Sequence, residues 1–279
     1  MWRKVVTVIA VVFLVVGLGF VLFPPVSNMI GNQIAKGEVN DFDQLVQNVV
    51  EETDNSGNPQ TFEKAKEEGK IDDEGYPVDE EGNRTSDNPV IFKPDLDRLL
   101  KDSREYNENL KQNQSSLLTD SYAYVQPSLD LPKYGIFSGI YGYVSAPSIN
   151  MELPIYLGAS NGNMSYGAAH LTYTSLPVGG EKTNVVLAGH TGYVGRIFFD
   201  NIRHLEIGAE VSVTNYWETL KYKVVETAIY KPEEAQAIYI NDERELLTML
   251  TCISDGKGGF DRYYVICERT TDDYYTANA

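Results

Sequence analysis

The sequence predicts a mainly β fold: a closed or nearly closed barrel of seven or eight short strands, with short helices in its connections. Two observations predict it. From Tyr134 onward, short segments rich in Val, Ile, Tyr and Thr alternate with turns rich in Gly, Pro and Asn. Before Tyr134 the chain instead carries a charge-free N-terminal segment, an acidic stretch and two amphipathic segments. We therefore expect the barrel to be preceded by an N-terminal transmembrane helix and a helical and acidic extension.

The barrel is expected over residues 134–270, followed by a polar tail at 271–279. Each expected strand is short, rich in β-branched or aromatic residues and bounded by turn-forming residues. The expected strands are Tyr141–Ile149, Leu153–Leu157, Thr183–Ala188, Glu210–Tyr216, Thr219–Tyr230, Leu246–Cys252 and Arg262–Arg269.

The N-terminus predicts a membrane anchor. Two basic residues precede Val5–Phe23, which carries no charge and would form a helix of about 28 Å, against a hydrocarbon core of roughly 30 Å. The alternative is a cleaved signal peptide, but its apolar stretch is usually about 7–15 residues long and ends at a small-residue cleavage site, whereas two prolines follow here. Residues 1–25 are thus expected to be a cytoplasmic stub and one membrane crossing. The positive-inside rule then places 26–279 outside the cytoplasm.

Residues 26–133 form the expected extension. Apolar residues spaced mostly three and four apart over 28–50 predict an amphipathic helix that needs a packing partner. The acidic stretch 51–95 is expected to be a solvated linker or a small hairpin-rich insert, acting as a spacer that sets the height of the barrel above the membrane. Its acidic runs lack the twelve-residue calcium-loop pattern, so acidic turns are the simpler interpretation. Pro94 and the apolar spacing after it predict a second amphipathic helix to about Gln114.

Composition excludes one large class of function. The formal net charge is −17 and the pI is near 4.6. A protein that binds nucleic acid needs a clustered basic surface, so we expect no nucleic-acid partner and favour cationic or neutral ones. The chain has only two cysteines, too few for a disulfide framework, and must gain its stability from packing.

Three residues of different chemistry stand at expected strand ends. Cys252 closes one strand and is followed by a turn-forming run, His190 follows another strand, and Arg262 opens the last strand. A hairpin between the last two strands would return Arg262 to the side of Cys252. Side chains at strand ends lie at the rim of a barrel, where a substrate can reach them.

These residue types together suit acyl transfer. An imidazole can generate a thiolate or hand a proton to a leaving amine, and a guanidinium can hold the negative charge that builds on a carbonyl oxygen under attack. Taken singly, each has a plainer interpretation: a cysteine as a small hydrophobe, a histidine as a satisfied polar group, an arginine as a surface cation. Their combined placement favours the catalytic interpretation.

The motifs resemble those of a known family. Thr-Met-Leu-Thr-Cys at 248–252 resembles the sortase signature Thr-Leu-x-Thr-Cys, with Met in place of Leu, and Ala-Gly-His-Thr-Gly at 188–192 resembles the sortase histidine motif. The stretch 170–180 is similar to the segment that pilin-type, class C sortases carry upstream of that histidine. The resemblance covers roughly residues 134–270. Papain-like proteases, by contrast, place Cys before His.

The resemblance implies an eight-stranded sortase-type barrel with His190, Cys252 and Arg262 as catalytic residues, and no metal or organic cofactor. The expected reaction is cleavage after Thr in a Leu-Pro-x-Thr-Gly-like sorting signal, through a thioacyl intermediate on Cys252, and transfer to an amine. In class C that amine is a pilin lysine. The expected partners are a sorting-signal-bearing surface or pilin protein and the amine acceptor. The expected location is the membrane of a Gram-positive-type cell surface.

Two alternative functions stay open. One is a housekeeping-type sortase that anchors proteins to the cell wall through a peptidoglycan-precursor amine. The other is an inactive sortase-like scaffold that only binds a sorting signal.

Residues 115–133 are a candidate lid over the active site. The lid sequence bears on the sortase class and therefore on the acceptor amine. Many class C sortases have a lid bearing Asp-Pro-aromatic, and this region offers Asp120 and Tyr122 without the proline.

The remaining candidates are less specific. The resemblance implies substrate-binding roles for Thr251 and His170, and a structural hydrogen-bonding role is the favoured alternative for His170. His204 is expected at the surface. Strand alternation points Cys267 to the opposite face from Arg262, so it is expected in the core and not as a second nucleophile.

Overall fold

The computed structural model describes residues 2–47, 62–86, 90, 94–118, 124–192, 195–234, 236–240 and 243–270. The α-helices are α1 (Trp2–Gln47), α2 (Phe62–Glu67), α3 (Leu96–Leu117) and α4 (Asn161–Met164). Short 3₁₀ turns are η2 (Leu131–Tyr134), η3 (Pro147–Ile149), η4 (Ile202–His204) and η5 (Gln236–Ile238). The strands are β1 (Ile140–Ala146), β2 (Met151–Leu157), β3 (Ala168–His170), β4 (Thr183–Ala188), β5 (Glu210–Asn215), β6 (Thr219–Tyr230), β7 (Glu245–Ser254) and β8 (Phe260–Arg269).

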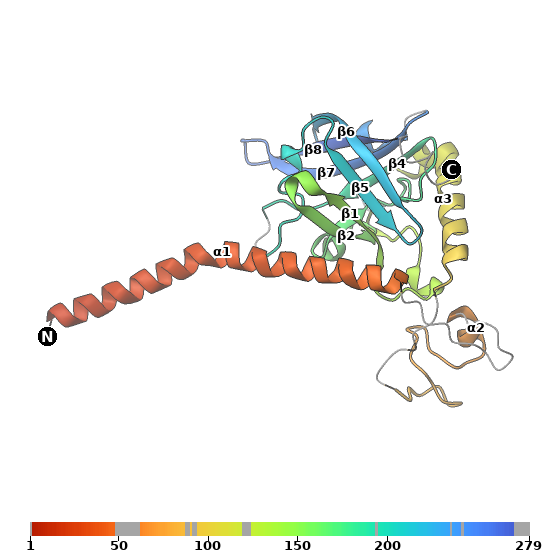
Figure 1. The fold of residues 1–279 in the computed structure, drawn as a ribbon, viewed down its shortest axis with the longest axis horizontal. Helices are drawn as coiled ribbons and strands as arrows, with labels where there is room; N and C mark the ends of the chain where they lie inside the picture. Colours follow the sequence, from red (N-terminus) through yellow and green to blue (C-terminus); the bar gives the residue numbers. More distant parts are fainter. Residues whose placement is uncertain are drawn as a thin grey trace.

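The strands close into a barrel in the order β1-β2-β3-β4-β7-β8-β6-β5 (Figure 1). Two neighbouring pairs are parallel, β2 with β3 and β4 with β7, and the others are antiparallel. The predicted mainly β barrel is confirmed. The expected strands match seven of the eight, and β3 was missed because a three-residue strand is too short to show a period-two pattern.

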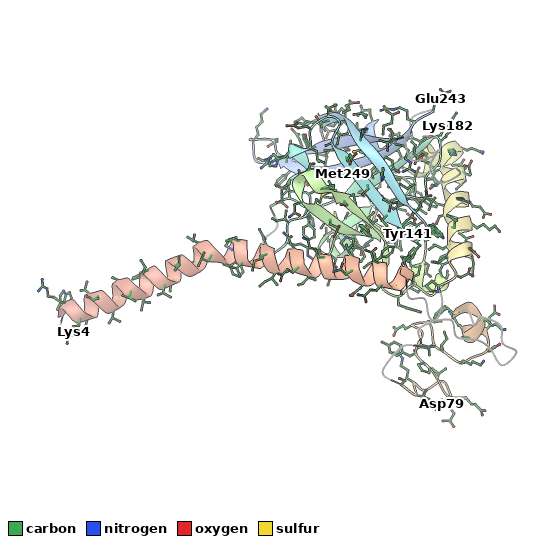
Figure 2. The ribbon with its side chains drawn as sticks, in the orientation of Figure 1. Lys4, Asp79, Tyr141, Lys182, Glu243 and Met249 are labelled. Carbon is green, nitrogen blue, oxygen red and sulfur yellow. The ribbon has the colours of Figure 1, made fainter. Side chains whose placement is uncertain are left out.

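The barrel interior is filled by alternate residues of the strands. Val185 and Leu187 of β4 face Leu247 and Met249 of β7 in one buried apolar cluster, and Figure 2 shows Met249 within the barrel. The intervening residues of β4 and β7, such as Val186, face outward. This alternation decides which side chains of β7 and β8 can meet a substrate.

Helix α1 runs without interruption through Pro24 and Pro25. Proline lacks the amide hydrogen that the helical ladder needs, and α1 bends partway along its length (Figure 1). The side chains of the apolar N-terminal half are largely exposed. By length and composition α1 can cross a membrane, as expected for Val5–Phe23.

The second half of α1 packs on the barrel. Ala35, Val39 and Phe42 are almost fully buried, and α1 lies against β1 and β2. The apolar stripe expected over 28–50 thus has the barrel as its partner. Since the chain docks on the barrel before it reaches the stretch 51–95, that stretch cannot set the height of the barrel, and the spacer expectation is wrong.

The described part of the acidic insert is a small hairpin-rich unit. It holds α2 and two isolated β-bridges, Ile71 with Pro77 and Val78 with Arg84. The carboxylate of Asp72 accepts the backbone N–H groups of Glu74 and Tyr76, which identifies its run as an acidic turn. Among the residues that the structure describes, no group of three or more His, Cys, Asp or Glu could hold a metal ion.

Helix α3 follows the expected pattern with one change at its start. Asp95 is the N-cap and accepts the backbone N–H of Arg98 at 3.1 Å, so Pro94 precedes the cap instead of opening the first turn. A buried Asn107 bonds both backbone groups of Leu176, at 2.8 and 3.0 Å. Helix α3 therefore holds the long connection between β3 and β4 against the barrel.

Candidate active site

One rim of the barrel brings Cys252 and Arg262 together. They are directly opposite each other in the antiparallel β7–β8 pair, and Arg262 Nη1 donates to Cys252 Sγ at 3.1 Å. Both side chains are partly exposed. The hairpin expected from the sequence thus places a permanent positive charge beside the sulfur.

The parallel pairing of β4 with β7 brings His190 to the same rim. Ala188 is the partner of Leu250, and the next backbone contact continues the pairing, with Gly189 N–H donating to the carbonyl of Leu250 at 3.2 Å. Two residues beyond that partner pair lie His190, just after the end of β4, and Cys252 on β7. Adjacent strands are about 4.8 Å apart, so the backbone positions of the imidazole and the thiol are neighbours.

Thr251 joins these two strand ends. Its side chain is only 3% exposed, and Thr251 Oγ1 donates to the carbonyl of Gly189 at 2.7 Å. The hydroxyl is therefore committed to the residue before His190 and is buried away from a substrate. The substrate-binding role expected for Thr251 does not fit this geometry, which instead makes it a positioning residue between β7 and the histidine.

His170 is fully buried at the end of β3. Its Nδ1 lies 3.2 Å from Ser128 Oγ, and its Nε2 lies 3.0 Å from the carbonyl oxygen of Ser175. Burial lowers the pKa of His170 to about 4 and outweighs the opposing hydrogen bonds to Ser175 and Thr174. These facts fit the structural alternative for His170, and they give a substrate no access to the ring.

The outer face of the barrel leading to Cys252 is apolar. Because side chains alternate, Leu250 and Cys252 share the outward face of β7, and Tyr264 and Arg262 share that of β8. A buried cluster on this face joins strands and connections: Leu118, Leu171, Val186, Ala188, Ile238 and Tyr264, with Tyr124 and Leu250 packed against it.

The candidate lid residues Asp120 and Tyr122 lie outside the described residues. The residues on either side, Leu118 and Tyr124, contact the apolar outer face.

Two secondary expectations are confirmed. Cys267 is fully buried in the barrel core, where burial raises the pKa of its thiol to about 12. A thiol with that pKa is un-ionised at neutral pH and does not act as a nucleophile. His204 is exposed, as expected.

Sequence reasoning missed Asp200, which organises the residues after His190. Asp200 Oδ1 accepts the backbone N–H of Gly192 at 2.6 Å, Asp200 Oδ2 accepts that of Phe198 at 3.1 Å, and Phe199 N–H donates to the carbonyl of His190 at 2.9 Å. The only signal in the sequence is an Asp ten residues after the histidine, and Asp is common in turns.

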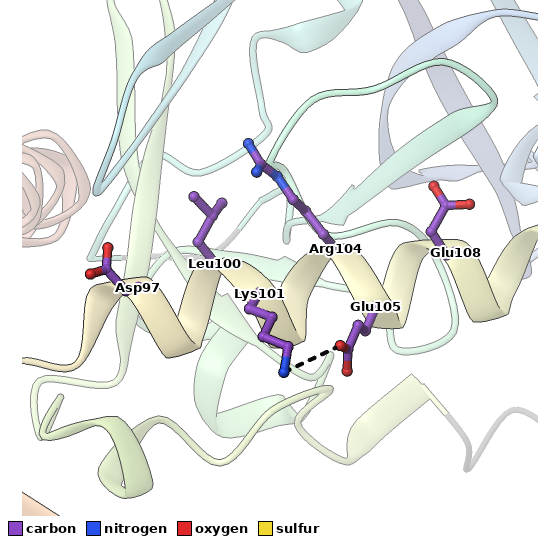
Figure 3. A pocket seen from close by; sticks show the side chains of 6 residues that line it. All are labelled: Asp97, Leu100, Lys101, Arg104, Glu105 and Glu108. Carbon is purple, nitrogen blue, oxygen red and sulfur yellow. Dashed lines mark ion pairs between the residues drawn. The ribbon is translucent and has the colours of Figure 1, made fainter.

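A separate hollow on the solvent side of α3 is lined by Asp97, Leu100, Lys101, Arg104, Glu105 and Glu108 (Figure 3). Its one drawn ion pair, Lys101 with Glu105 at 3.7 Å, is exposed, and such pairs are worth little. None of its lining residues is a candidate site residue, so we assign it no function.

Comparisons with known proteins identify the family to which this barrel and its rim belong. A family model described as the sortase domain matches residues 144–270. The X-ray structure of Clostridium perfringens sortase C with the C-terminal cell wall sorting motif is 32% identical in sequence, with a TM-score of 0.52 over 63% of this chain and 89% of that one. The chain belongs to the sortase family. Sortases are cysteine transpeptidases, which accords with a thiol, an imidazole and a guanidinium on one rim.

Other sortases extend the likeness. Sortase C1 of GBS pilus island 1 is 27% identical, with a TM-score of 0.54 over 63% of this chain and 89% of that one. Sortase A of Streptococcus agalactiae is 28% identical over 117 residues, which are 40% of this chain and 47% of that protein. The chain thus spans about half the length of the curated sortases it matches, and its own activity, substrates and partners are matters for a proposal.

Proposed function

We propose that this sortase is a cysteine transpeptidase with Cys252 as nucleophile, His190 as proton-transfer residue and Arg262 as oxyanion and substrate clamp. The observation that carries the proposal is the 3.1 Å contact from Arg262 Nη1 to Cys252 Sγ, at the point where the β4–β7 register brings His190 alongside. Cys252 and Arg262 sit on paired strands of the barrel, and His190 sits in the connection directly after β4.

The first half-reaction is acylation. The sulfur of Cys252 attacks the carbonyl carbon of a peptide bond, and negative charge builds on the carbonyl oxygen within reach of the Arg262 donors. When the C–N bond breaks, the imidazolium of His190 gives its proton to the leaving amine. The products are a thioester on Cys252 and a free peptide amine.

The second half-reaction is transfer. An acceptor amine attacks the thioester carbon, the neutral imidazole of His190 takes a proton from that amine, and the C–S bond breaks. The sulfur leaves and regains the ionisation state in which it started. The new amide bond conserves the energy of the bond that was cut, and the reaction as written needs only the peptide and the amine.

The proposed donor substrate is a Leu-Pro-x-Thr-Gly-like sorting signal, cut after Thr. The Clostridium perfringens sortase C was solved with a cell wall sorting motif, which supports a substrate of this class. In this chain, the half-buried side chain of Leu250 shares the outward face of β7 with Cys252 and offers an apolar contact for such a substrate.

The proposed acceptor is a pilin lysine, as in pilus assembly. The similarity to sortase C structures, one of them from a pilus island, supports it. Curated relatives with the names sortase A and sortase D favour a second candidate, a peptidoglycan-precursor amine used for cell-wall anchoring. Offering the acyl-enzyme both amines in one mixture distinguishes them by the mass of the product.

The proposed location is a cell membrane, crossed once by Val5–Phe23, with residues 26–279 on the extracytoplasmic face of a Gram-positive-type cell. The exposed apolar half of α1 supports an anchor. Complete digestion of the barrel by protease added to intact protoplasts is the expected result. Protection of the barrel would contradict this sidedness.

The decisive experiment uses the full chain in detergent micelles and a fluorogenic peptide carrying the sorting signal. Cleavage by the unaltered protein and its loss in Cys252→Ala are expected, with Cys267→Ala as the matched control that keeps activity. Peptide cleavage by the Cys252→Ala variant would contradict the proposed function. A peptide that binds the unaltered protein but is never cut would identify an inactive scaffold.

A further inference from the structure

The position of His190 depends on contacts beyond its strand. Strand β4 ends at Ala188, so His190 belongs to the connection that follows. Contacts within that connection close it on itself, through Asp200 and the bond from Phe199 N–H to the carbonyl of His190. What fixes this closed unit relative to the barrel therefore also fixes the imidazole.

Helix α1 provides two hydrogen bonds to this connection. Asn28 Oδ1 accepts the backbone N–H of Gly195 at 2.8 Å, and Asn32 Oδ1 accepts that of Ile197 at 3.1 Å. Residues four apart lie on one face of a helix, so a single face of α1 binds the backbone of residues 195–197.

Between the two asparagines, Gly31 lets the backbones touch. A Cβ built on Gly31 would lie 1.7 Å from the carbonyl oxygen of Gly195, far inside any real contact, so α1 and the connection meet without room for a side chain. Gly37, six residues further along the same helix, has nothing within 4 Å of its built Cβ. The close approach is thus specific to Gly31.

An ion pair with little exposure reinforces the contact. The side chain of Arg196 is 8% exposed and that of Glu38 is 24% exposed, and Arg196 Nη1 lies 3.3 Å from Glu38 Oε2. Arg196 Nη1 also donates to the carbonyl of Tyr166, just before β3. A buried guanidinium without its carboxylate is costly, so α1 completes the electrostatics of the segment behind His190.

We propose that the face of α1 formed by Asn28, Gly31 and Asn32 is a positioning element for His190, so that the helix carrying the membrane-spanning segment sets the catalytic geometry at the rim. The inference rests on the proposed role of His190 in proton transfer. It assigns α1 a part in the reaction rate, in addition to anchoring.

The test compares Gly31→Ala with Gly37→Ala in the full chain in detergent micelles. Both changes replace a helical glycine by alanine, which favours the helix by roughly 0.5–1 kcal/mol, and only the first forces the residues after His190 to move. In Gly31→Ala we expect kcat for peptide cleavage to fall by about 10- to 100-fold, because displacing a catalytic group by about 1 Å has costs of that order. KM and the thiol labelling rate of Cys252 are expected to stay unchanged. In Gly37→Ala, kcat is expected to equal that of the unaltered protein. Equal kcat in the two variants would overturn the inference.

A rescue series separates positioning from general packing. Asn32→Asp keeps an oxygen that accepts from Ile197 N–H, whereas Asn32→Leu keeps the size and removes the acceptor. We expect kcat to fall in the leucine variant and to be largely restored in the aspartate variant. Equal kcat in both variants would contradict a hydrogen-bonding role for the asparagine.

A spectroscopic readout keeps this inference distinct from the proposed function. The chain has three histidines, so their ring signals can be assigned by NMR with selectively labelled histidine. In Gly31→Ala the signals of His190 are expected to shift while those of His170 and His204 stay. Unmoved His190 signals would overturn the positioning even if the enzyme is active. A protein that never cleaves the peptide would overturn the function and leave this measurement valid.

Discussion

The rim and the interior of this barrel hold the same three chemical groups in opposite settings. The rim carries His190, Cys252 and Arg262. A second histidine, cysteine and arginine lie elsewhere in the barrel: His170 at the end of β3, and Cys267 and Arg269 in β8. Cys252 is partly exposed with a guanidinium 3.1 Å away, whereas Cys267 is fully buried among apolar residues. Residue type alone therefore does not locate a site in this chain. Strand position and side-chain alternation do.

The difference follows from the geometry of two strands. Cys252 lies near the C-terminal end of β7, at the rim, and faces outward. Cys267 lies near the C-terminal end of β8, toward the opposite end of the barrel, and faces inward. A shift of one residue in register would exchange the two faces, exposing a core cysteine and burying the nucleophile. The hydrophobic pattern that fixes the core thus also fixes the active site.

Thiol labelling tests the contrast between the cysteines most strongly. With a methanethiosulfonate reagent, the native protein is expected to take up one label, at Cys252, because the buried thiol of Cys267 has a pKa of about 12. Both cysteines are expected to react in urea. Mass spectrometry of the peptides gives the site, and a first label on Cys267 would break the comparison.

Two arginines of β8 give the next contrast. Arg262→Gln removes the charged donors beside the sulfur, and peptide cleavage is expected to fall by roughly 10²- to 10³-fold with little change in unfolding temperature. Arg269→Gln is the matched control. Arg269 Nε lies 3.5 Å from Glu245 Oε1, and both side chains are nearly buried, so its loss is expected to cost roughly 3–5 kcal/mol of stability and to leave the activity of the folded protein.

Steady-state kinetics and thermal unfolding of the two arginine variants measure both effects. Reversed outcomes, with activity lost in Arg269→Gln and stability lost in Arg262→Gln, would mean that the rim was assigned to the wrong end of β8.

The buried His170 and the exposed His204 give the smallest contrast, which is in how the stability of the protein depends on pH. The pKa of His170 is about 4 in the folded protein against 6.5 ordinarily, so below pH 6.5 the unfolded chain binds a proton that the folded protein does not. This contribution of His170 to the free energy of unfolding is complete above about pH 6.5. It is lost as the pH falls toward 4, and the total loss is roughly 3 kcal/mol. Urea unfolding at pH 7 and pH 4.5 measures it.

The matched variants for this prediction are His170→Asn and His204→Asn. The first is expected to be less stable at pH 7 but to lose less on acidification. The second, changed at an exposed position, is expected to lose as much as the unaltered protein. An equal loss in His170→Asn would contradict the buried, neutral imidazole.

Most of the barrel could be predicted from local pattern. The bounds of β4 and β6 match the expected Thr183–Ala188 and Thr219–Tyr230, because Gly, Pro and Asn turns delimit β-branched runs. Strand β3 was missed because its identity comes from pairing with β2 and β4, not from its own three residues. Helix α1 continues past Pro24 and Pro25 because its packing on the barrel outweighs the local cost of proline.

The site was predictable in its residues but not in its supports. Cys252 and Arg262 meet because a hairpin is a local structure that a sequence reveals. The bonds from Asn28 and Asn32 join residues more than 160 positions apart, and neither asparagine differs in the sequence from a surface residue. The buried roles of Thr251 and His170 likewise depend on contacts with Gly189 and Ser128 that only the folded chain brings together.

The direction in which α1 crosses the barrel has a consequence for access. Asn28 and Asn32 bind at the His190 rim, while Phe42 packs with Ile140 and Tyr216 at the opposite end. With Val5–Phe23 in a bilayer, the rim that carries Cys252 would therefore be the end of the barrel nearer the membrane, because about 12 Å of helix separates the end of the apolar segment from Gly31. Polypeptides that are themselves anchored in the membrane would then reach this rim directly, whereas polypeptides that arrive at the opposite end of the barrel would have to pass around it.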